Sequence, residues 1–277
     1  MLPIKKILFP VDFSDSCVGA ARYAEALAGR FEAEILLLHV VGMGEHSLPE
    51  DLLPGRKAKL EKFLTGELKY FTVQRTCVIG DPASTIVETA RAWQPDLVMI
   101  PTHGLGFFRR HLLGSVTAKV LHDLDCPVWT CVHSEQAPPL ERISCHKVLC
   151  AVDLGERSRS VVEWAKSLAA EYDAELGIAY ATLGVEAAAA GTYIDEEFTR
   201  SLAAEARARV GELQAETGTD AIVYVNAGDP ANVVSCAAKD FNADLLVIGR
   251  HTSTGVAGLL HSAFGILRSS PCPVISI

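Results

Sequence analysis

The residues best suited to chemistry lie in one glycine-bearing segment, PTHGLGFFRRHLLGSVTAKVL, which begins at Pro101. Gly104 is followed, after nine intervening residues, by Gly114 and Ser115 at the start of a predicted helix. Glycines let backbone N–H groups approach phosphate oxygens, and a helix N-terminus adds partial positive charge. The Ser115 hydroxyl can donate one more hydrogen bond. The segment therefore predicts an anion cradle. The alternative, which these residues by themselves favour, is an ordinary strand–loop–helix connection capped by Ser115.

The other polar side chains of this segment leave their roles open. Arg109 and Arg110 could contact the outer phosphates of a nucleotide or an acidic partner, and could equally be solvated surface residues. His103 has a counterpart, His251, in a second occurrence of the pattern. For both histidines we favour a ring hydrogen bond that caps the end of a strand over a role in catalysis.

The charge balance excludes some classes of partner. The chain has a net charge of −9, and division after Arg142 gives 15 basic and 17 acidic residues before that point and 10 and 17 after it. Nucleic acids and anionic membrane surfaces need clustered Lys and Arg, so neither is expected as the main partner. An anionic ligand should prefer the first half. No apolar stretch has the length of a membrane span, and we expect a soluble cytoplasmic protein.

Six potential metal ligands fall close together in the middle of the chain, namely Cys126, Cys131, His133, Cys145, His146 and Cys150. No C-x2-C pair is present, and several of these residues belong to separate predicted strands, whose side chains alternate between faces. We therefore expect no metal site. Most of the eight cysteines lie in apolar runs, which favours reduced, buried thiols over a disulfide framework.

Four sequence blocks occur twice in the same order. KKILFPVDFSDS recurs as HKVLCAVDLGER, VIGDPASTIVETA as NAGDPANVVSCAA, PDLVMIPTHG as ADLLVIGRHT, and DCPVWTCV as PCPVISI. The offset between the copies stays between 141 and 148 residues. Such a repeat predicts two similar domains, which we place at residues 1–134 and 146–277, joined by a polar, proline-bearing linker over 135–145.

Within each copy, short apolar runs alternate with amphipathic stretches, the pattern of β-α units on a parallel sheet. We predict strands near 4–10, 35–41, 72–79, 96–101 and 127–132, and again near 147–152, 175–181, 221–226, 244–249 and 273–277. We predict helices near 15–30, 52–69, 82–93 and 113–123, and again near 157–171, 195–217, 230–241 and 260–269. Asp81 and Asp229, each before a proline, are expected helix N-caps. The predicted fold class is α/β, with two tandem five-stranded, open twisted, Rossmann-like parallel sheets flanked by helices.

In these motifs the chain resembles the universal stress protein family in its tandem two-domain form. Nucleotide-binding members carry G-x2-G-x9-G-(S/T) after an Asp at the end of the first strand and an LHV at the end of the second. This sequence has Asp12 in FPVDFS, LHV at residues 38–40, and then Gly104, Gly114 and Ser115. The resemblance covers nearly the whole chain twice.

The resemblance implies a set of nucleotide-binding residues in the first copy. Asp12 and the Val40 backbone would contact the adenine end, whereas Gly104, Gly114, Ser115 and the Val116 N–H would hold phosphates. The full predicted set is Pro10, Val11, Asp12, Val40, Ile100, Pro101, Gly104, Gly114, Ser115 and Val116. The implied ligand is ATP or a related adenine nucleotide, with Mg²⁺ as its counter-ion.

The sequence departs from the family motif in both copies. Pro101 replaces the first glycine and has no N–H, so a contact near the ribose could be lost or reshaped. In the second copy Gly249 and Asp153 remain, but Thr252 replaces the second glycine, Tyr180-Ala181 replaces His39-Val40, and either His261 or Ser262 stands opposite Gly114. Bulky side chains block close approach to a backbone cradle. We therefore predict that the second pocket has lost nucleotide binding.

No nucleophile, base and metal come together in the sequence, and no Walker loop is present, so we expect no enzyme. The main hypothesis is a stress-response regulator in which ATP biases the segments 42–58 and 105–113 and so changes binding of an unidentified protein partner. Alternatives are a nucleotide-free scaffold and a slow ATPase or self-phosphorylating protein. The resemblance also implies that the two copies pair as a pseudo-dimer through their terminal strands, and leaves further dimerisation open.

Overall fold

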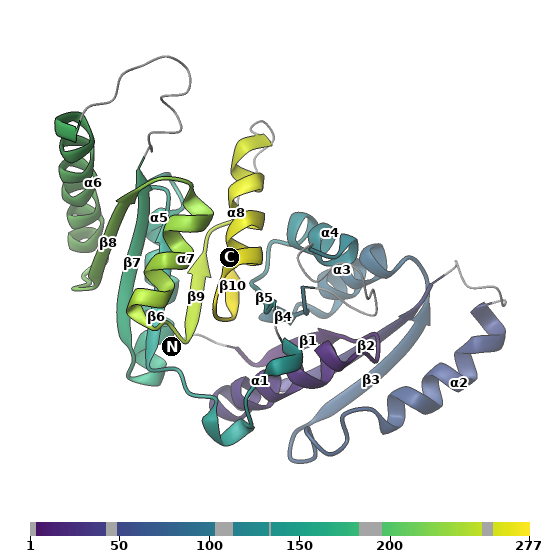
Figure 1. Ribbon diagram of the computed structural model, residues 1–277. Helices are drawn as coiled ribbons and strands as arrows, with labels where there is room; N and C mark the ends of the chain where they lie inside the picture. Colours follow the sequence, from purple (N-terminus) through teal and green to yellow (C-terminus); the bar gives the residue numbers. More distant parts are fainter. Residues whose placement is uncertain (1–3, 43–48, 103–112, 133, 183–195, 251–256) are drawn as a thin grey trace. The chain divides into compact units, whose positions relative to one another are not determined.

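The computed structural model describes residues 4–42, 49–102, 113–132, 134–182, 196–250 and 257–277. Contacts divide the chain into two compact units. We call Pro3–Ser144 the N-terminal unit and Cys145–Ile277 the C-terminal unit. Each contains one five-stranded parallel sheet with helices between its strands, as Figure 1 shows. The predicted fold class is therefore confirmed.

The N-terminal unit alternates strands and helices. Its elements are β1 (Lys6–Pro10), α1 (Asp15–Phe31), β2 (Glu34–Val41), α2 (Pro49–Lys62), β3 (Val73–Ile79), α3 (Pro82–Trp93), β4 (Leu97–Met99), α4 (Ser115–Asp123) and β5 (Val128–Thr130), followed by 3-10 turns η1 (Ser134–Gln136) and η2 (Leu140–Arg142). Its strands are ordered β3-β2-β1-β4-β5, all parallel. The strand order therefore reverses direction between β1 and β4.

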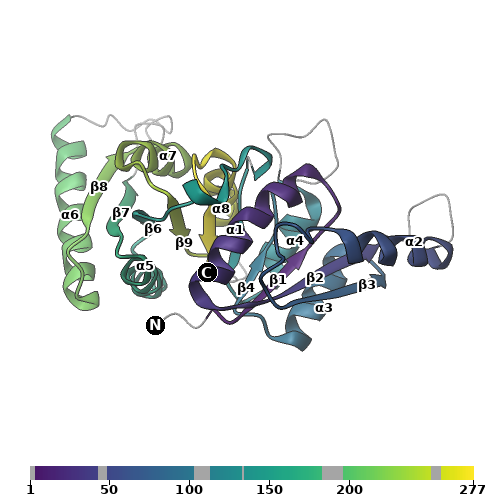
Figure 2. The same cartoon turned by 90° about the horizontal axis from the view of Figure 1, so that it is seen from below.

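The C-terminal unit repeats this plan. Its elements are β6 (Lys147–Val152), α5 (Ser158–Tyr172), β7 (Glu175–Thr182), α6 (Glu196–Thr217), β8 (Ile222–Ala227), α7 (Pro230–Phe241), β9 (Leu245–Ile248), α8 (Ala257–Ser269) and β10 (Val274–Ser276). The order β10-β9-β6-β7-β8 places the reversal between β6 and β9. Helix α7 packs on α8, and α5 packs on α6. Figure 2 shows α5 and α7 on opposite sides of β6.

The strands are apolar on both faces because helices cover both faces. In the N-terminal unit Phe9, Leu37 and Met99 are fully buried, and Leu149 is fully buried in the C-terminal unit. Continuous apolar runs are typical of such doubly covered parallel strands. The strand predictions from the sequence rest on this pattern, and each predicted strand is present.

Helix boundaries follow local capping chemistry. The Asp81 carboxylate accepts a hydrogen bond from the Ser84 N–H at 2.9 Å, and Asp229 accepts one from the Asn232 N–H at 3.0 Å. Both aspartates are therefore N-caps, as predicted. At the opposite ends of the helices, matched residues adopt left-handed backbone: Glu32 and Asp173 after α1 and α5, and Gln94 and Asn242 after α3 and α7. The two copies thus share their caps as well as their strands.

The helix predicted over 52–69 is wrong at its C-terminal end. Helix α2 ends at Lys62, and Leu64 has a φ of 56°, which cannot continue a right-handed helix. The Arg75 guanidinium of β3 donates to the carbonyls of Leu60 at 3.1 Å and Phe63 at 3.3 Å. The carbonyls at the end of a helix have no partner within the helix, and here Arg75 supplies one. Because Arg75 lies on a later strand, the residues of the helix alone do not reveal this contact.

The segment predicted as a linker is packed against α1. A Cβ at Gly19 would overlap the carbonyl oxygen of Ser134, and the Arg22 guanidinium donates to the carbonyl of Ala137. Ser134 is fully buried. We call residues 134–142, which contain η1 and η2, the strap. The strap approaches α1 so closely that only glycine fits at position 19.

Candidate functional site

The N-terminal unit has its candidate site where the strand order reverses, at the carboxyl ends of β1 and β4. Open parallel sheets bind ligands in the crevice at such a reversal. Strands β1, β2 and β4 all end at this edge because they are parallel, and the segments that follow them begin there. Of the sequence-predicted residues, Asp12 follows β1, Val40 lies near the end of β2, and Gly114 and Ser115 lie at the start of α4.

Asp12 is held in one orientation by its own turn. One carboxylate oxygen, Oδ1, accepts from the Ser14 N–H at 3.0 Å and from the Cys17 thiol at 3.2 Å. Between Asp12 and Ser14, Phe13 has a φ of 65°, an uncommon value for a bulky residue. The turn fixes the carboxylate just after the end of β1, beside the point where the strand order reverses. It also keeps Asp12 partly exposed to solvent.

The Cys17 thiol that contacts Asp12 is a donor rather than a nucleophile. Burial, and then the charge of Asp12, raise the pKa of Cys17 to about 12. The sulfur therefore keeps its proton at neutral pH and donates it to the carboxylate. Because the thiolate is the reactive form of cysteine, Cys17 serves to position Asp12.

Val40 lies on an uncovered stretch of β2. Pairing between β1 and β2 ends at Pro10↔Leu38, whereas pairing between β2 and β3 continues to Val41↔Ile79. The Leu38 carbonyl accepts from the Val11 N–H on the β1 side at 2.8 Å. Backbone groups alternate along a strand, so those of Val40 also face the β1 side, beyond the last pair. This geometry offers a backbone edge to a planar polar ligand.

His39, beside Val40, is buried and neutral. Its Nδ1 donates to the Val11 carbonyl at 2.8 Å, and burial lowers its pKa below the ordinary value of 6.5. The ring packs against Phe13 with centroids 4.2 Å apart. His39 therefore supports the turn that carries Asp12, a role that the LHV resemblance did not indicate.

Three residues near Asp12 were missed by the sequence prediction. Phe13 packs edge-on against Phe63, with centroids 5.1 Å apart, and the Lys59 ammonium lies 4.4 Å from the Phe13 ring centroid. Phe63 and Lys59 come from the end of α2 and the turn after it. The only signal in the sequence was Phe13 itself, an aromatic residue directly after the aspartate. It joins α2 to the crevice.

Two hydrogen bonds join the residues just after β4 to the start of α4. The Gly114 N–H donates to the Thr102 carbonyl at 2.7 Å, and the Thr117 hydroxyl donates to the Pro101 carbonyl at 2.9 Å. These bonds hold the two ends of the segment together and set the first turn of α4 at the crevice. N–H groups in the first turn of a helix have no acceptor within the helix, so they are suited to bind an anion.

Ser115 is exposed and Val116 and Gly114 are half-buried at this helix start. Gly114 occupies the N-cap position with extended backbone and makes no side-chain cap. The expected Ser115 cap is therefore wrong, because Ser115 is already inside the helix. The choice between an anion cradle and an ordinary strand–loop–helix connection is not decided by this. The Ser115 hydroxyl lies at the N-terminus of α4, on the side of the sheet where the strands have their carboxyl ends.

Pro101 does not disturb the pairing of β4. The N–H groups of alternate residues face the β5 segment: Val98 donates to Pro127 at 2.9 Å, Ile100 to Trp129 at 3.0 Å, and Thr102 to Cys131 at 3.5 Å. Position 101 lies between these donors in the alternation. Its missing N–H therefore costs no bond to β5. Pro10, Val11, Ile100 and Pro101 are all buried, and their role in a nucleotide site stays a prediction.

Several predicted residues lie outside the described residues. These are His103, Gly104, Arg109, Arg110, His251 and Thr252, together with the side chains of His261 and Ser262. Among the described residues, no group of three or more His, Cys, Asp or Glu could hold a metal ion. In the same part of the chain no disulfide joins the cysteines, and no helix is long and apolar enough to cross a membrane.

The C-terminal unit repeats the aspartate turn in detail. The Asp153 Oδ1 accepts from the Gly155 N–H at 2.8 Å and from the Ser158 hydroxyl at 3.0 Å, and Leu154 has a φ of 57°. Ser158 thus stands where Cys17 does. The equivalence is residue by residue, so Asp12 corresponds to Asp153 with an offset of 141.

Around this turn the C-terminal unit differs. A Cβ at Gly249, the counterpart of Pro101, would lie 3.2 Å from Cγ2 of Val161. The residue equivalent to Val161 in α1 is Ala20, so the N-terminal unit has the large residue on the strand and the small one on the helix. The Arg157 guanidinium donates to the Arg250 carbonyl at 2.8 Å.

Comparison with known proteins identifies relatives of both units. The model of the universal stress protein family matches residues 3–131 and again 145–277. A universal stress protein of Methanocaldococcus jannaschii is 33% identical over 135 residues, covering 45% of this chain and 79% of that protein. One from Mycobacterium bovis is 27% identical over 225 residues, covering 78% of this chain and 72% of that protein.

A solved universal stress protein from Archaeoglobus fulgidus shares the fold across the full length. It covers 100% of this chain and 97% of its own, with a TM-score of 0.74 at 19% identity. The two matches of the family model together span nearly every described residue of both units. The chain therefore belongs to the universal stress protein family, as two tandem copies of its domain.

Proposed function

We propose that the N-terminal unit binds ATP or a related adenine nucleotide and that the protein acts as a regulator in stress response. The observation that carries the proposal is the closed base of the segment after β4, where Gly114 and Thr117 bond to Thr102 and Pro101. It sets the start of α4 beside the crevice that also holds Asp12. Anions bind well at such helix starts.

The donors and acceptors of the crevice suit an adenine nucleotide. The Asp12 carboxylate accepts from a ribose hydroxyl or an adenine amino group, and the backbone of Val40 faces past the end of β1. The Ser115 hydroxyl and the first-turn N–H groups of α4 suit phosphate oxygens, with Mg²⁺ carried by the triphosphate. Gly104 would complete the cradle.

Regulation follows from the contacts of Phe13. Its ring packs on Phe63 and lies under Lys59, and both belong to the α2 region. A nucleotide against Asp12 would meet Phe13 and so bias the segment 42–58, which contains most of α2. We propose that a protein partner in the cytoplasm reads this change. The pairing of the two copies as a pseudo-dimer stays a prediction.

The direct experiment is extraction of small molecules from freshly purified protein. The proposal expects about one adenine nucleotide per chain. The Gly114→Val and Gly104→Val variants should lose at least about a hundredfold in affinity for added ATP, because a branched side chain blocks the cradle. Gly42→Val is a control, since a Cβ at Gly42 has no atom within 4 Å.

Two results would redirect the proposal. If the intact protein binds no nucleotide and the glycine variants change nothing, the nucleotide-free scaffold is the better account. If labelled ATP turns over above the level of heat-killed protein, and the turnover falls in Gly114→Val, the slow ATPase replaces pure binding. A nucleotide that binds without turnover supports the regulator.

A further inference from the structure

Two cations of α2 lie near the end of the candidate site that carries Asp12. The Lys59 ammonium lies 4.4 Å from the ring centroid of Phe13, the residue directly after Asp12. Arg56 precedes Lys59 by three positions on α2, and residues three apart lie on one face of a helix. Both cations therefore extend from the same side of α2.

The electrostatics of two paired strand residues show where these charges lie. His39 of β2 is paired with Cys77 of β3. Burial lowers the pKa of His39, and the charges of Arg56 and Lys59 lower it further. Burial raises the pKa of Cys77, and the charges of Lys57 and Arg56 oppose this rise. Because such effects require nearby charges, Arg56 and Lys59 lie close to the carboxyl ends of β2 and β3.

These cations lie on the side of the crevice away from the start of α4. Helix α2 packs on β2 and β3, whereas α4 follows β4, and β1 separates β2 from β4. The charges that act on His39 are the carboxylate of Asp12 and the two cations of α2. In the proposed binding mode this side receives the adenosine, and its base and ribose are neutral. An ordinary nucleotide, with its phosphates at α4, leaves the two cations without an anion from the ligand.

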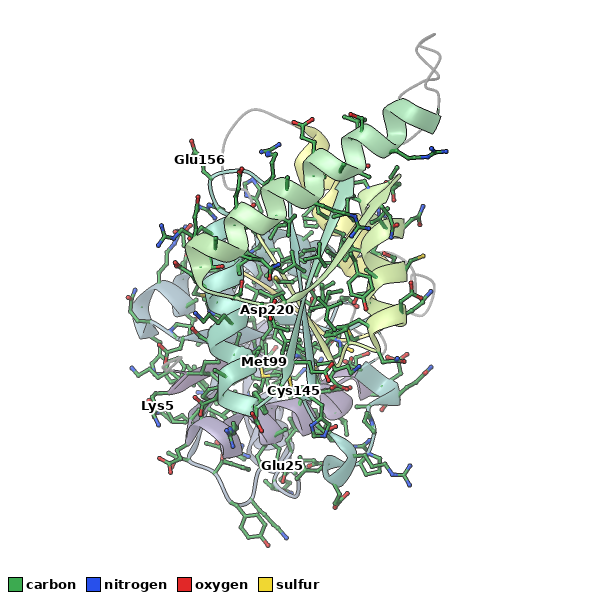
Figure 3. The ribbon with its side chains drawn as sticks, turned by 90° about the vertical axis from the view of Figure 1, so that its left-hand side faces the viewer. Lys5, Glu25, Met99, Cys145, Glu156 and Asp220 are labelled. Carbon is green, nitrogen blue, oxygen red and sulfur yellow. The ribbon has the colours of Figure 1, made fainter. Side chains whose placement is uncertain are left out.

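The C-terminal unit uses its matched cation differently. Arg209 of α6 donates to the Leu154 carbonyl at 3.3 Å, in the turn that matches the one beside Lys59. Figure 3 shows Glu156 of this turn at the opposite end of the unit from Cys145, which precedes β6. Arg209 is bound to backbone, whereas Lys59 makes no hydrogen bond or ion pair with any residue that the structure describes. The three N–H donors of Lys59 are therefore available to a ligand.

The ring of Phe13 gives the Lys59 ammonium a defined place before a ligand binds. This ring packs against His39, with centroids 4.2 Å apart, and edge-on against Phe63, with centroids 5.1 Å apart. An exposed contact between a cation and a ring face is weak. A phosphate oxygen carries a full charge and is a stronger acceptor, so the ammonium would move to it at little cost.

We propose that Lys59, with Arg56 adding positive charge, binds a second phosphate carried on the 2′ or 3′ oxygen of the ribose. This inference rests on the nucleotide site proposed above and adds the class of nucleotide that the site prefers. Where an aspartate at a strand end bonds to a ribose hydroxyl, a nearby cation can accommodate a ribose phosphate. This side of the crevice has both groups, so one ribose oxygen would bond to Asp12 and the other would carry the phosphate.

The test compares three isomers that carry two phosphates on the same adenosine. ADP has both on the 5′ oxygen, whereas adenosine 2′,5′-bisphosphate and adenosine 3′,5′-bisphosphate have one of them on another ribose oxygen. Each isomer is titrated into the full chain at low ionic strength, with calorimetry as the readout. We expect one bisphosphate to bind about fivefold more tightly than ADP, a factor typical of an ion pair with an exposed lysine. The tighter isomer identifies the ribose oxygen.

Matched variants assign this preference to one side chain. Lys59→Met removes the charge and keeps an unbranched chain beside Phe13, so it should abolish the preference and change the affinity for ADP by less than about twofold. Lys59→Arg keeps the charge and should keep the preference. Lys69→Met is the control, because the Lys69 ammonium lies 4.5 Å from the ring centroid of Tyr70, and it should leave all three affinities unchanged.

The outcomes separate this subsite from the nucleotide site itself. If ADP binds at least as tightly as both bisphosphates, the ribose-phosphate subsite is wrong while the nucleotide site stands. The same conclusion follows if folded Lys59→Met keeps the preference or weakens all three isomers equally. If none of the three isomers binds, the nucleotide site fails and the subsite fails with it.

Discussion

The turns at Asp12 and Asp153 are nearly identical, and the side chains around them are not. Both aspartates accept from the N–H two residues on and from a hydroxyl or thiol five residues on, and both precede a left-handed residue. Beyond the turn, Ser16 is matched with Arg157 and Pro101 with Gly249. The turn is a requirement of the fold, because it starts a helix after a buried strand. The residues around the turn are free to change, and the two units differ there.

A second difference lies on the helix that follows each turn. Gly19 of α1 lies beneath the strap, whereas its counterpart on α5, Ser160, is exposed. The first helix of the N-terminal unit is therefore covered at this position, and that of the C-terminal unit is exposed there. The comparison teaches that the two copies diverged in their surroundings as well as in their crevices.

The largest expected effect tests whether the strap packs on α1 at Gly19 while the equivalent position of α5 is exposed. Gly19→Ala places a Cβ on the Ser134 carbonyl and should lower the free energy of unfolding by about 3 kcal/mol. Ser160→Ala should change it by less than about 0.5 kcal/mol. Denaturant unfolding of both variants measures the contrast. Equal effects would mean that the strap does not hold α1.

A smaller effect tests the exchange of large and small residues. Gly249→Pro gives the C-terminal unit the residue of the N-terminal unit and should cost about 2 kcal/mol, because Val161 occupies the space. In a Val161→Ala background, which imitates Ala20, the cost should fall by about 1 kcal/mol. A double-mutant cycle measures this coupling. Additive costs would contradict the packing argument.

The donors to the aspartates provide the third test. Cys17→Ala and Ser158→Ala each remove one hydrogen bond to a carboxylate and should cost about 1 kcal/mol. Cys17→Ser should be tolerated, because Ser158 already makes the same contact with Asp153. Thermal unfolding compares the three.

In addition, the pKa of about 12 predicts that an alkylating reagent modifies Cys17 in the folded protein far more slowly than in the unfolded chain.

The smallest expected effect depends on pH. Burial lowers the pKa of His39, so the unfolded chain binds the proton more tightly than the folded one. The stability contributed by neutral His39 is present above the ordinary value of 6.5 and is lost as the pH falls below it. The C-terminal unit has Tyr180 at this position and lacks this dependence.

Hydrogen exchange at several pH values resolves the two units. His39→Tyr should reduce the acid sensitivity of the N-terminal unit, although the larger ring also changes packing against Phe13. His39→Asn is the second variant, since its amide can donate to the Val11 carbonyl without titrating. If both variants keep the full acid response of the intact protein, another group is responsible.

Much of the fold followed from the sequence because its signals are local. Apolar strand runs, the N-caps Asp81 and Asp229, and the repeat itself required only neighbouring residues or direct comparison. The candidate site was predicted less completely. Asp12 and Val40 came from the family resemblance, whereas Gly114 came first from the glycine spacing before a predicted helix. The structure adds that the Cys17 thiol bonds to Asp12 and that the Gly114 N–H bonds to the Thr102 carbonyl.

The features that the sequence did not reveal depend on contacts between distant segments. Arg75 of β3 bonds to the end of α2, and residues more than a hundred positions away pack against Gly19. The hydrogen bond from the Arg157 guanidinium to the Arg250 carbonyl joins residues 93 positions apart, and the sequence does not indicate it. Left-handed Phe13 was equally hidden, because aromatic residues rarely adopt that conformation.

The strap has a practical consequence for dividing the protein. The family match ends at residue 131, which suggests a cut there, yet the chain that covers Gly19 and accepts from Arg22 lies beyond it. An N-terminal half trimmed at that point would leave a bare glycine surface on α1 and invite association or fraying. A fragment that runs to Ser144 keeps its own cover and is the better starting point for expression, labelling or crystallisation.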